Sequence, residues 1–287
     1  MLKQRIITAV ILAPLAILAI LFLPVELFKI AVAGVVALGA YEWAKMSGIN
    51  GRAAKVTFMA LILIICGVLI FAVDGQAVWY QSELNALYKT ILSIAAVWWA
   101  VSLVMILTYP KYSSVWKENI PIRAAFGVLT LIPTWVAIIS LRTNLYEVDP
   151  FYGASLIFYV LGIVWAADIG AFFCGVKFGK HKLRPNVSPG KSIEGLLGGI
   201  MASLAIIAFA ALHYQFDASR IGMHILIGVI TVAVSALGDL NESMFKRCAG
   251  IKDSGKLLPG HGGVMDRIDS LTAAFPVFAF CYVVWMA

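Results

Sequence analysis

The longest polar stretch of the sequence, residues 243–270, carries residues of the types that bind metal ions and phosphates. It places five cations and three aspartates around a Gly-His-Gly-Gly run at residues 260–263. The cations are Lys246, Arg247, Lys252, Lys256 and Arg267, and the aspartates are Asp253, Asp266 and Asp269. Carboxylate oxygens suit magnesium, cations suit phosphates, and glycine lets the backbone approach a ligand closely. The stretch therefore predicts a metal–phosphate site.

Carboxylates recur at helical spacing around the start of this stretch. Four polar residues share one face of a helix: Asp239, Glu242, Ser243 and Lys246. Magnesium usually takes one or two protein carboxylates together with phosphate and water, so we expect Asp239, Asp266 and Asp269 to be the metal ligands. Asp266 and Asp269 lie three residues apart at the start of an apolar segment, and the alternative for them is that they only stabilise a helix N-terminus.

A second polar loop contributes a lysine. The segment Ser188-Pro-Gly-Lys191 can direct Ser188, Lys191 and backbone amides toward a phosphate at the start of a helix. The following Gly-Lys-Ser is not a Walker A motif, because Pro185 stands where the first glycine is required. We expect Lys191 to contact phosphate, whereas anchoring at the membrane surface is the alternative.

Two isolated polar residues complete the set of candidates. Asp168 lies inside an apolar run, where a charge costs about 2.5–3.5 kcal/mol, so it is expected to be functional unless it only pairs with a neighbouring helix. His261 lies between glycines and is expected to be a hydrogen-bond donor or a structural residue rather than a base. The other histidines are scattered and none of the four cysteines forms a C-x-x-C pair, so neither zinc nor a disulfide framework is expected.

The rest of the chain must position these residues in a membrane. The chain of 287 residues is 62% hydrophobic and 13% charged, whereas soluble domains are about half apolar and a quarter charged. Apolar runs of about 20 residues predict an all-α polytopic membrane protein with about nine transmembrane helices. The predicted spans are 6–23, 27–45, 56–73, 90–109, 124–141, 153–174, 195–214, 222–240 and 270–287. The first run is long for a signal peptide, so we expect it to be retained.

Charge predicts how these spans are oriented. Most of the 22 lysines and arginines fall in alternate loops, which places those loops and the N-terminus in the cytoplasm. The two polar loops, 175–194 and 241–269, lie on that side, so a polar active-site cavity is expected to face the cytoplasm. We divide the chain into residues 1–150, with about five N-terminal spans, and residues 151–287, a catalytic region with about four spans and the two basic loops.

Net charge and small residues indicate which partners the protein is expected to have. The net charge of +7 fits a positive membrane border, so no nucleic acid is expected. The G-x-x-x-G pairs Gly175/Gly179 and Gly195/Gly199 make a homodimer plausible, although tight packing within the chain would also explain them.

The stretch from Ser243 to Asp269 resembles the signature of phosphatidate cytidylyltransferases, also called CDP-diglyceride synthases. The matching residues are Ser243, Lys246, Arg247, Lys252, Asp253, Gly255, Pro259, His261, Gly262, Gly263, Asp266, Arg267 and Asp269. Ser188-Pro-Gly-Lys191 and Asp168-Ile-Gly extend the match, whereas residues 56–150 add only topology.

This resemblance implies a reaction in a bacterial inner membrane, in which CTP and phosphatidic acid give CDP-diacylglycerol and pyrophosphate. It implies Mg²⁺, with K⁺ as a possible second ion, and it implies that Asp239 and Asp266 meet across one metal. The implied catalytic residues are Asp239, Asp266, Lys191 and Arg267, and the implied substrate-binding residues are Ser188, Lys246, Arg247, Lys252, His261 and Asp168. A phosphate dianion attacks without a general base, which agrees with a sequence that offers no convincing nucleophile–base pair.

Two other functions remain open at this point. A CTP-dependent kinase of a membrane lipid alcohol would need a base for its hydroxyl acceptor and would release CDP. A transporter or flippase would need charged residues at the bilayer midplane and paired broken helices, whereas here the charges gather at one face.

Overall fold

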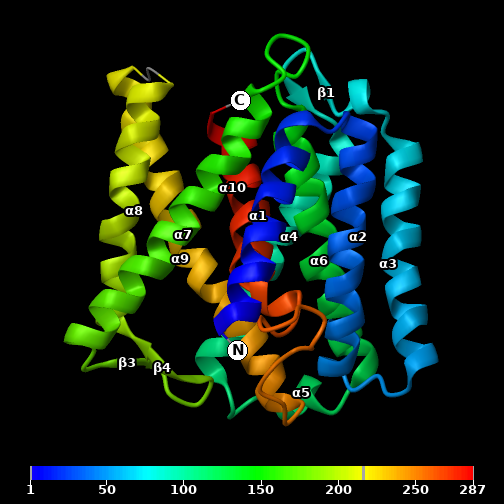
Figure 1. Ribbon diagram of the computed structural model, residues 1–287, viewed down its shortest axis with the longest axis vertical. Coiled ribbons are helices and arrows are strands. Elements are labelled where there is room, and N and C mark those ends of the chain that lie inside the picture. Colours follow the sequence, from blue (N-terminus) through cyan, green and yellow to red (C-terminus); the bar gives the residue numbers. More distant parts are fainter. Residues whose placement is uncertain (1, 215–216, 287) are drawn as a thin grey trace.

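The computed structural model describes residues 2–214 and 217–286, which fold into a bundle of long helices with two short hairpins (Figure 1). The helices are α1 (Leu2–Phe22), α2 (Val25–Met46), α3 (Arg52–Ala72), α4 (Ala86–Thr108), α5 (Ser114–Lys117), α6 (Ile120–Thr143), α7 (Tyr152–Phe178), α8 (Ile193–His213), α9 (Ala218–Cys248) and α10 (Met265–Trp285). A 3-10 turn η1 (Gly75–Ala77) precedes the hairpin of β1 (Trp79–Tyr80) and β2 (Glu83–Leu84), and β3 (Lys182–Arg184) pairs antiparallel with β4 (Ser188–Ser192).

The helices confirm the predicted fold class. Eight of the described helices, α2 to α4 and α6 to α10, are long and apolar enough to cross a membrane, and the apolar part of α1, Ile6–Phe22, is shorter. Helices satisfy their own backbone hydrogen bonds, which is what the bilayer interior demands. The protein is therefore a multi-pass membrane protein of about nine spans.

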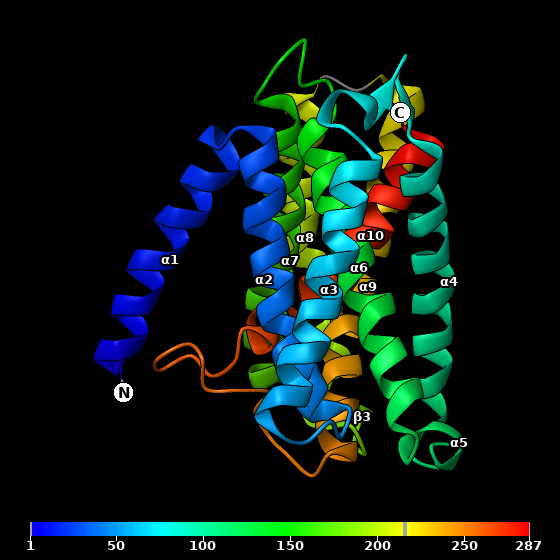
Figure 2. The ribbon, with the colours of Figure 1, turned by 90° about the vertical axis from the view of Figure 1, so that its right-hand side faces the viewer.

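Helix α1 leans away from the rest of the bundle (Figure 2). Ile20 near its C-terminus is buried, whereas Val10 and Leu15 are exposed. Its N-terminal half instead contacts the loop of residues 249–264, because Thr8 Oγ1 donates a hydrogen bond of 2.9 Å to the Pro259 carbonyl. The first span thus touches the polar loop that the sequence singled out.

The last two spans extend beyond their predicted limits. The sequence predicts a span that ends at residue 240 and another that starts at residue 270, whereas α9 continues to Cys248 and α10 already begins at Met265. Hydropathy falls at the first charges, but packing sustains the helices, since Met244 and Phe245 are fully buried. Lys246, Arg247, Asp266 and Asp269 therefore lie on helices, while Lys252, Asp253, Lys256 and His261 lie in the loop between them. The prediction that Asp239 ends its span is wrong.

Helices α7 and α8 pack closely through small residues. A side chain at Gly199 would place its Cβ 2.7 Å from the Ala167 carbonyl, and a Cβ at Gly195 would lie 3.0 Å from the Ala171 carbonyl. The predicted G-x-x-x-G pairs thus serve packing within the chain. This approach brings the Asp168 segment of α7 beside the start of α8.

The loops separate into two groups at opposite ends of the bundle (Figure 1). The N-terminal end of α1, the β3–β4 hairpin and the loop 249–264 lie at one end, which we call the catalytic end. The β1–β2 hairpin and the C-terminal end of α10 lie at the other, which we call the distal end. Both basic loops thus share one end of the bundle, as the predicted topology requires.

Candidate active site

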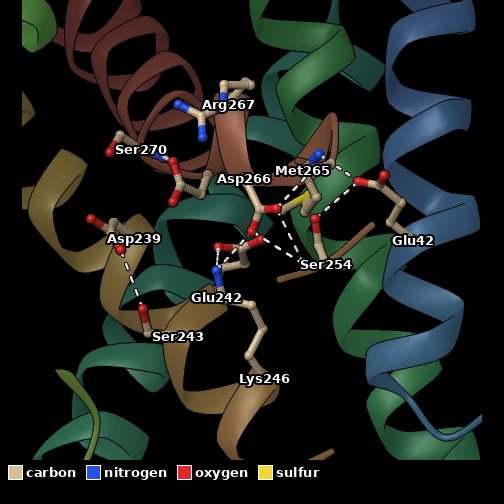
Figure 3. Close-up of polar contacts among 12 residues, drawn as sticks. Glu42, Asp239, Glu242, Ser243, Lys246, Ser254, Met265, Asp266, Arg267 and Ser270 are labelled. Carbon is tan, nitrogen blue, oxygen red and sulfur yellow. Dashed lines mark hydrogen bonds and ion pairs between the residues drawn. The ribbon is translucent and has the colours of Figure 1, made fainter. Parts of the chain in front are cut away.

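Lys246 joins the last turns of α9 to the first turn of α10. Its Nζ lies 2.6 Å from Glu242 Oε2 and 2.8 Å from Asp266 Oδ1 (Figure 3). Glu242 is one helical turn before Lys246 and is fully buried, so this ion pair is shielded from solvent. The contact ties the two helices together and sets the position of the Asp266 carboxylate.

Backbone amides complete the surroundings of Asp266. Gly263 N donates to Oδ2 at 2.9 Å, and Ser254 N donates to both carboxylate oxygens at 3.2 Å. The loop 249–264 thus folds back over the start of α10 and encloses this carboxylate. Because its bonds come from the backbone and from a lysine whose side chain is only 13% exposed, Asp266 is held in one orientation.

Asp239 lies earlier on α9 than Lys246, and it forms an ion pair with Lys191, the other predicted lysine. Lys191 Nζ lies 2.5 Å from Asp239 Oδ2, and Ser243 Oγ donates to Oδ1 at 3.3 Å. The lysine and aspartate side chains remain 26% and 33% exposed, so a ligand can reach them. The structure therefore brings together two predicted residues that lie far apart in the sequence.

The β3–β4 hairpin that carries Lys191 is fixed at several points. Ser192 caps α8 by accepting a hydrogen bond of 3.1 Å from Gly195 N. The Glu194 carboxylate accepts hydrogen bonds from Lys180 N and His181 N and lies 2.6 Å from His181 Nδ1. Arg247 Nε donates to the Val187 carbonyl at 3.3 Å, which anchors the hairpin to α9.

A cavity of about 340 Å³ lies beside this ion pair. Asp168, Lys191 and Asp239 line it together with apolar residues of α7, α8 and α9 such as Phe172 and Leu196. Its lining combines charged groups with an apolar wall, as a site for an amphipathic substrate requires. The predicted polar cavity is therefore present, with Asp168 in its wall.

Asp269 lies one turn after Asp266 in α10, within electrostatic range of both lysine pairs. Its carboxylate accepts a hydrogen bond of 2.7 Å from Ser270 N, and it interacts electrostatically with Asp239, Lys191 and Lys246. Asp239 forms its ion pair with Lys191, whereas Asp266 forms its ion pair with Lys246. The two aspartates therefore have different lysine partners. That they meet across one metal stays a prediction.

The donor atoms of this cluster fit a magnesium ion that keeps substrate and water ligands. No group of three or more His, Cys, Asp or Glu side chains within residues 2–214 and 217–286 is already arranged to enclose a metal. Magnesium needs only one or two carboxylates, and the cluster supplies hard oxygens close together. Glu242 Oε1 is buried without a hydrogen-bond partner, so this carboxylate retains a donor atom for a cation.

The remaining predicted residues have no described side-chain contact with the carboxylates of Asp239, Asp266 or Asp269. Arg267 is exposed on α10, and its Nε donates to the His261 carbonyl at 3.0 Å. His261 Nδ1 is buried and has no hydrogen-bond partner. Ser188 is partly buried at the start of β4, and Lys252 is exposed on the loop 249–264. Substrate contacts by these four residues stay predictions.

Residue types and spacing did not point to Glu42 or Ser254. Glu42 lies on α2, far from the motif, yet its Oε2 accepts hydrogen bonds from Ser254 Oγ at 3.0 Å and Met265 N at 2.8 Å (Figure 3). The available signal was a single acidic residue inside the predicted span 27–45. By the argument applied to Asp168, a charge in such a run is a functional candidate.

Comparison with known proteins shows which family the chain resembles. A sequence profile of the cytidylyltransferase family matches residues 3–285. A Haemophilus influenzae protein named phosphatidate cytidylyltransferase is 40% identical, over 98% of this chain and 99% of its own length. A Pseudomonas aeruginosa protein of the same name is 42% identical, over 97% of this chain and 96% of its own length. A Staphylococcus aureus protein of that name is 35% identical, over 62% of this chain and 75% of its own length. The first two similarities cover the whole bundle and not only the motif.

Proposed function

The chain belongs to the cytidylyltransferase family, and we propose that it transfers the cytidylyl group of CTP to phosphatidic acid. The products are CDP-diacylglycerol and pyrophosphate, so the reaction belongs to phospholipid biosynthesis. The chain's relatives along its full length are named for this activity, and they make it a nucleotidyltransferase enzyme. The observation that carries the proposal is the pair of lysine–carboxylate contacts, Lys191–Asp239 and Lys246–Asp266, beside a cavity between membrane helices.

The chemistry needs positioning more than it needs a base. A phosphate oxygen of the lipid attacks the α-phosphorus of CTP, the bond to the β-phosphate bridging oxygen breaks, and pyrophosphate leaves with that electron pair. The lipid phosphate is an anion before the reaction, so no proton must be removed from it. Cations that neutralise the triphosphate therefore supply the main stabilisation of the transition state.

Each charged residue has a role in this scheme. Lys191 and Lys246 leave their carboxylates to contact phosphate groups of CTP or the lipid, and Arg267 holds the departing pyrophosphate. Ser188, Arg247, Lys252, His261 and Asp168 bound the substrate site. The apolar wall of the cavity accommodates the lipid near its headgroup, while the catalytic end faces the cytoplasm, where CTP is present.

Asp239, Asp266 and Asp269 would hold Mg²⁺, with K⁺ as a possible second ion. A bound divalent ion neutralises phosphate charge and favours attack at phosphorus. The chain's own contribution is to aim these carboxylates, which the bonds from Ser243, Ser254 and Gly263 do.

Labelled CTP tests the proposal directly. Purified protein is incubated with phosphatidic acid, Mg²⁺ and CTP that carries ³²P at either the α or the γ position, and the lipid is then extracted. Transfer of the α label into lipid, with pyrophosphate release, supports cytidylyl transfer. Transfer of the γ label, with release of CDP, would instead identify a lipid-alcohol kinase and overturn the proposal. For that arm, a long-chain alcohol replaces phosphatidic acid as the acceptor.

A further inference from the structure

Glu42 is a buried carboxylate in the N-terminal half of the bundle. It lies in α2 near the catalytic end and is only 3% exposed. Among the described residues it has no ion pair with a lysine, arginine or histidine. Burying an ionised group is costly unless hydrogen bonds compensate it, and Glu42 accepts such bonds at Oε2 alone, since its Oε1 is buried without a partner.

Two hydrogen bonds connect Glu42 to the loop 249–264 and to α10. Its Oε2 accepts from Ser254 Oγ at 3.0 Å and from Met265 N at 2.8 Å. The N-cap residue of α10, Val264, makes no side-chain capping bond of its own. Glu42 therefore caps this helix from another helix, and its charge favours the helix N-terminus.

Ser254 links the Glu42 carboxylate to Asp266. The hydroxyl of Ser254 donates to Glu42, while its backbone N–H donates to both oxygens of Asp266 at 3.2 Å (Figure 3). Glycines permit this arrangement, because a Cβ at Gly263 would collide with the Ser254 hydroxyl and the Glu42 carboxylate. The loop 249–264 thus packs around the Glu42 carboxylate, and its backbone N–H groups at Ser254 and Gly263 donate hydrogen bonds to Asp266.

We propose that Glu42 is a positioning residue of the transferase, which acts through Ser254 and Met265 to fix the Asp266 carboxylate and to close the loop 249–264. Only the kinetic consequence of this role rests on the proposed function. The structural consequence, a closed loop, holds whatever reaction the site performs. Glu42 itself does not touch the substrate in this account.

Glu42→Gln tests this role because it keeps the shape of the side chain and removes the charge. The matched control is Glu26→Gln, which breaks the ion pair of 2.9 Å with buried Lys29 at the distal end of the same helix. Both variants disturb a charge of α2, but only Glu42→Gln is expected to affect the loop. Full-length protein in detergent is used throughout.

The first readout is tryptic cleavage after Lys252 and Lys256, which are exposed on the loop. We expect Glu42→Gln to accelerate cleavage at these two sites several-fold, while Glu26→Gln leaves it at the wild-type rate. Because this readout needs no reaction, it stays informative if the wild-type protein forms no CDP-diacylglycerol, a result that contradicts only the proposed function. Wild-type cleavage rates in Glu42→Gln, or equal acceleration in both variants, overturn the inference.

The second readout separates kcat from KM. Residues that orient a metal-binding group typically cost 10–100-fold, and we expect a loss of about that size in kcat for Glu42→Gln, with KM for phosphatidic acid nearly unchanged. Equal losses in Glu26→Gln, or a rise in KM alone, contradict a positioning role. If Glu42→Gln does not fold, Ser254→Ala removes one of the two bonds and is expected to give smaller changes in the same direction. Wild-type loop cleavage and kcat in Ser254→Ala overturn the inference.

A double variant tests the connection between the two residues. If Glu42 acts partly through the Ser254 hydroxyl, Glu42→Gln with Ser254→Ala loses less activity than the product of the two single losses. Independent, multiplicative losses show that the Ser254 path is absent.

Discussion

Cationic side chains are buried or partly buried at both ends of the bundle, but their hydrogen-bond and ion-pair partners differ. At the distal end, Lys29 and Arg142 are 0% and 1% exposed. At the catalytic end, Lys246 is partly exposed and Lys191 more so. Depth of burial alone would therefore select the distal end as the functional one.

The partners of these cations separate the two ends. Arg142 donates to the backbone carbonyls of Pro150 at 3.0 Å and Leu21 at 3.5 Å, and it lies against the rings of Phe28 and Tyr146. These backbone carbonyls are held in place by the fold, so they cannot reorient to bind a ligand. Lys191 and Lys246 instead contact carboxylates, which can exchange a lysine for a metal ion while the lysine turns to phosphate. At the distal end Lys29 also contacts a carboxylate, Glu26 at 2.9 Å, but that pair lies within one helix, whereas Lys191–Asp239 and Lys246–Asp266 join separate segments. A cation on backbone carbonyls therefore indicates stability, and cation–carboxylate pairs that join separate segments beside a cavity indicate chemistry.

Cavity size, like the burial of the cations, would by itself select the distal end. The distal end holds the larger cavity, about 860 Å³, whereas the cavity beside Asp239 holds about 340 Å³. The larger one is lined by residues in the ranges 24–26, 74–82 and 143–148, and its acidic residues Glu26, Asp74 and Glu147 are exposed. We assign the reaction to the smaller cavity because the Lys191–Asp239 ion pair lines it, whereas no ion pair among the described residues joins two residues that line the larger cavity.

Asp239→Asn gives the largest effect that the comparison predicts. An amide neither pairs with Lys191 as an ion nor binds a divalent cation as a carboxylate does. We expect turnover to fall about 100-fold or more, equivalent to about 2.7 kcal/mol of transition-state stabilisation, with little change in the thermal midpoint. The measurement is CDP-diacylglycerol formation at saturating CTP and Mg²⁺, and turnover near the wild-type value would remove Asp239 from the metal site.

Lys191→Ala is expected to act mainly on CTP. Loss of this cation removes a charge-assisted contact to phosphate, and hydrogen bonds of that kind contribute about 1.5–3 kcal/mol. We expect the KM for CTP to rise by about tenfold or more, while the KM for phosphatidic acid changes less. Initial rates at varied CTP check this, and an unchanged CTP dependence would exclude Lys191 from the nucleotide site.

Arg142→Ala probes the distal end. It leaves two carbonyls without their donor and removes the packing on two rings, so the protein should lose about 1–3 kcal/mol of stability. Turnover per folded molecule should stay within about twofold of wild type, since this site binds no ligand in our account. Thermal unfolding in detergent and activity at low temperature measure the two quantities separately. A large loss of turnover in folded protein would mean that the two ends are coupled.

His181→Ala should have the smallest effect. The contact of 2.6 Å between His181 Nδ1 and Glu194 is on an exposed side chain, and such pairs contribute little. The backbone bonds from residues 180 and 181 to Glu194 remain and still hold the hairpin. We expect the KM for CTP to rise less than about threefold. A tenfold rise would show that this side chain, and not the backbone, orients Lys191.

Composition and motif spacing were sufficient to predict the membrane fold. They also singled out Lys191 and Asp239, which the structure brings into contact beside a cavity, while the roles of these residues stay predictions. They failed for Glu42, because its partners are more than two hundred positions later in the sequence. Its role arises from the packing of α2 beside the start of α10, which local periodicity does not encode. The ends of α9 and α10 were missed for a related reason: hydropathy registers charges as a boundary, whereas buried Met244 and Phe245 continue the helix. The division at residue 150 stays a prediction, and Glu42 shows that the first half supplies part of the site's support.

The most direct test of the difference between the two ends is turnover of Asp266→Asn and Arg142→Ala measured side by side. Transfer of α-labelled cytidylyl phosphate from CTP to phosphatidic acid is recorded with Mg²⁺ and divided by the amount of folded protein. Our account predicts that Asp266→Asn stays folded and loses about 100-fold or more, while Arg142→Ala keeps turnover within about twofold and loses stability. Near wild-type turnover in Asp266→Asn would contradict it.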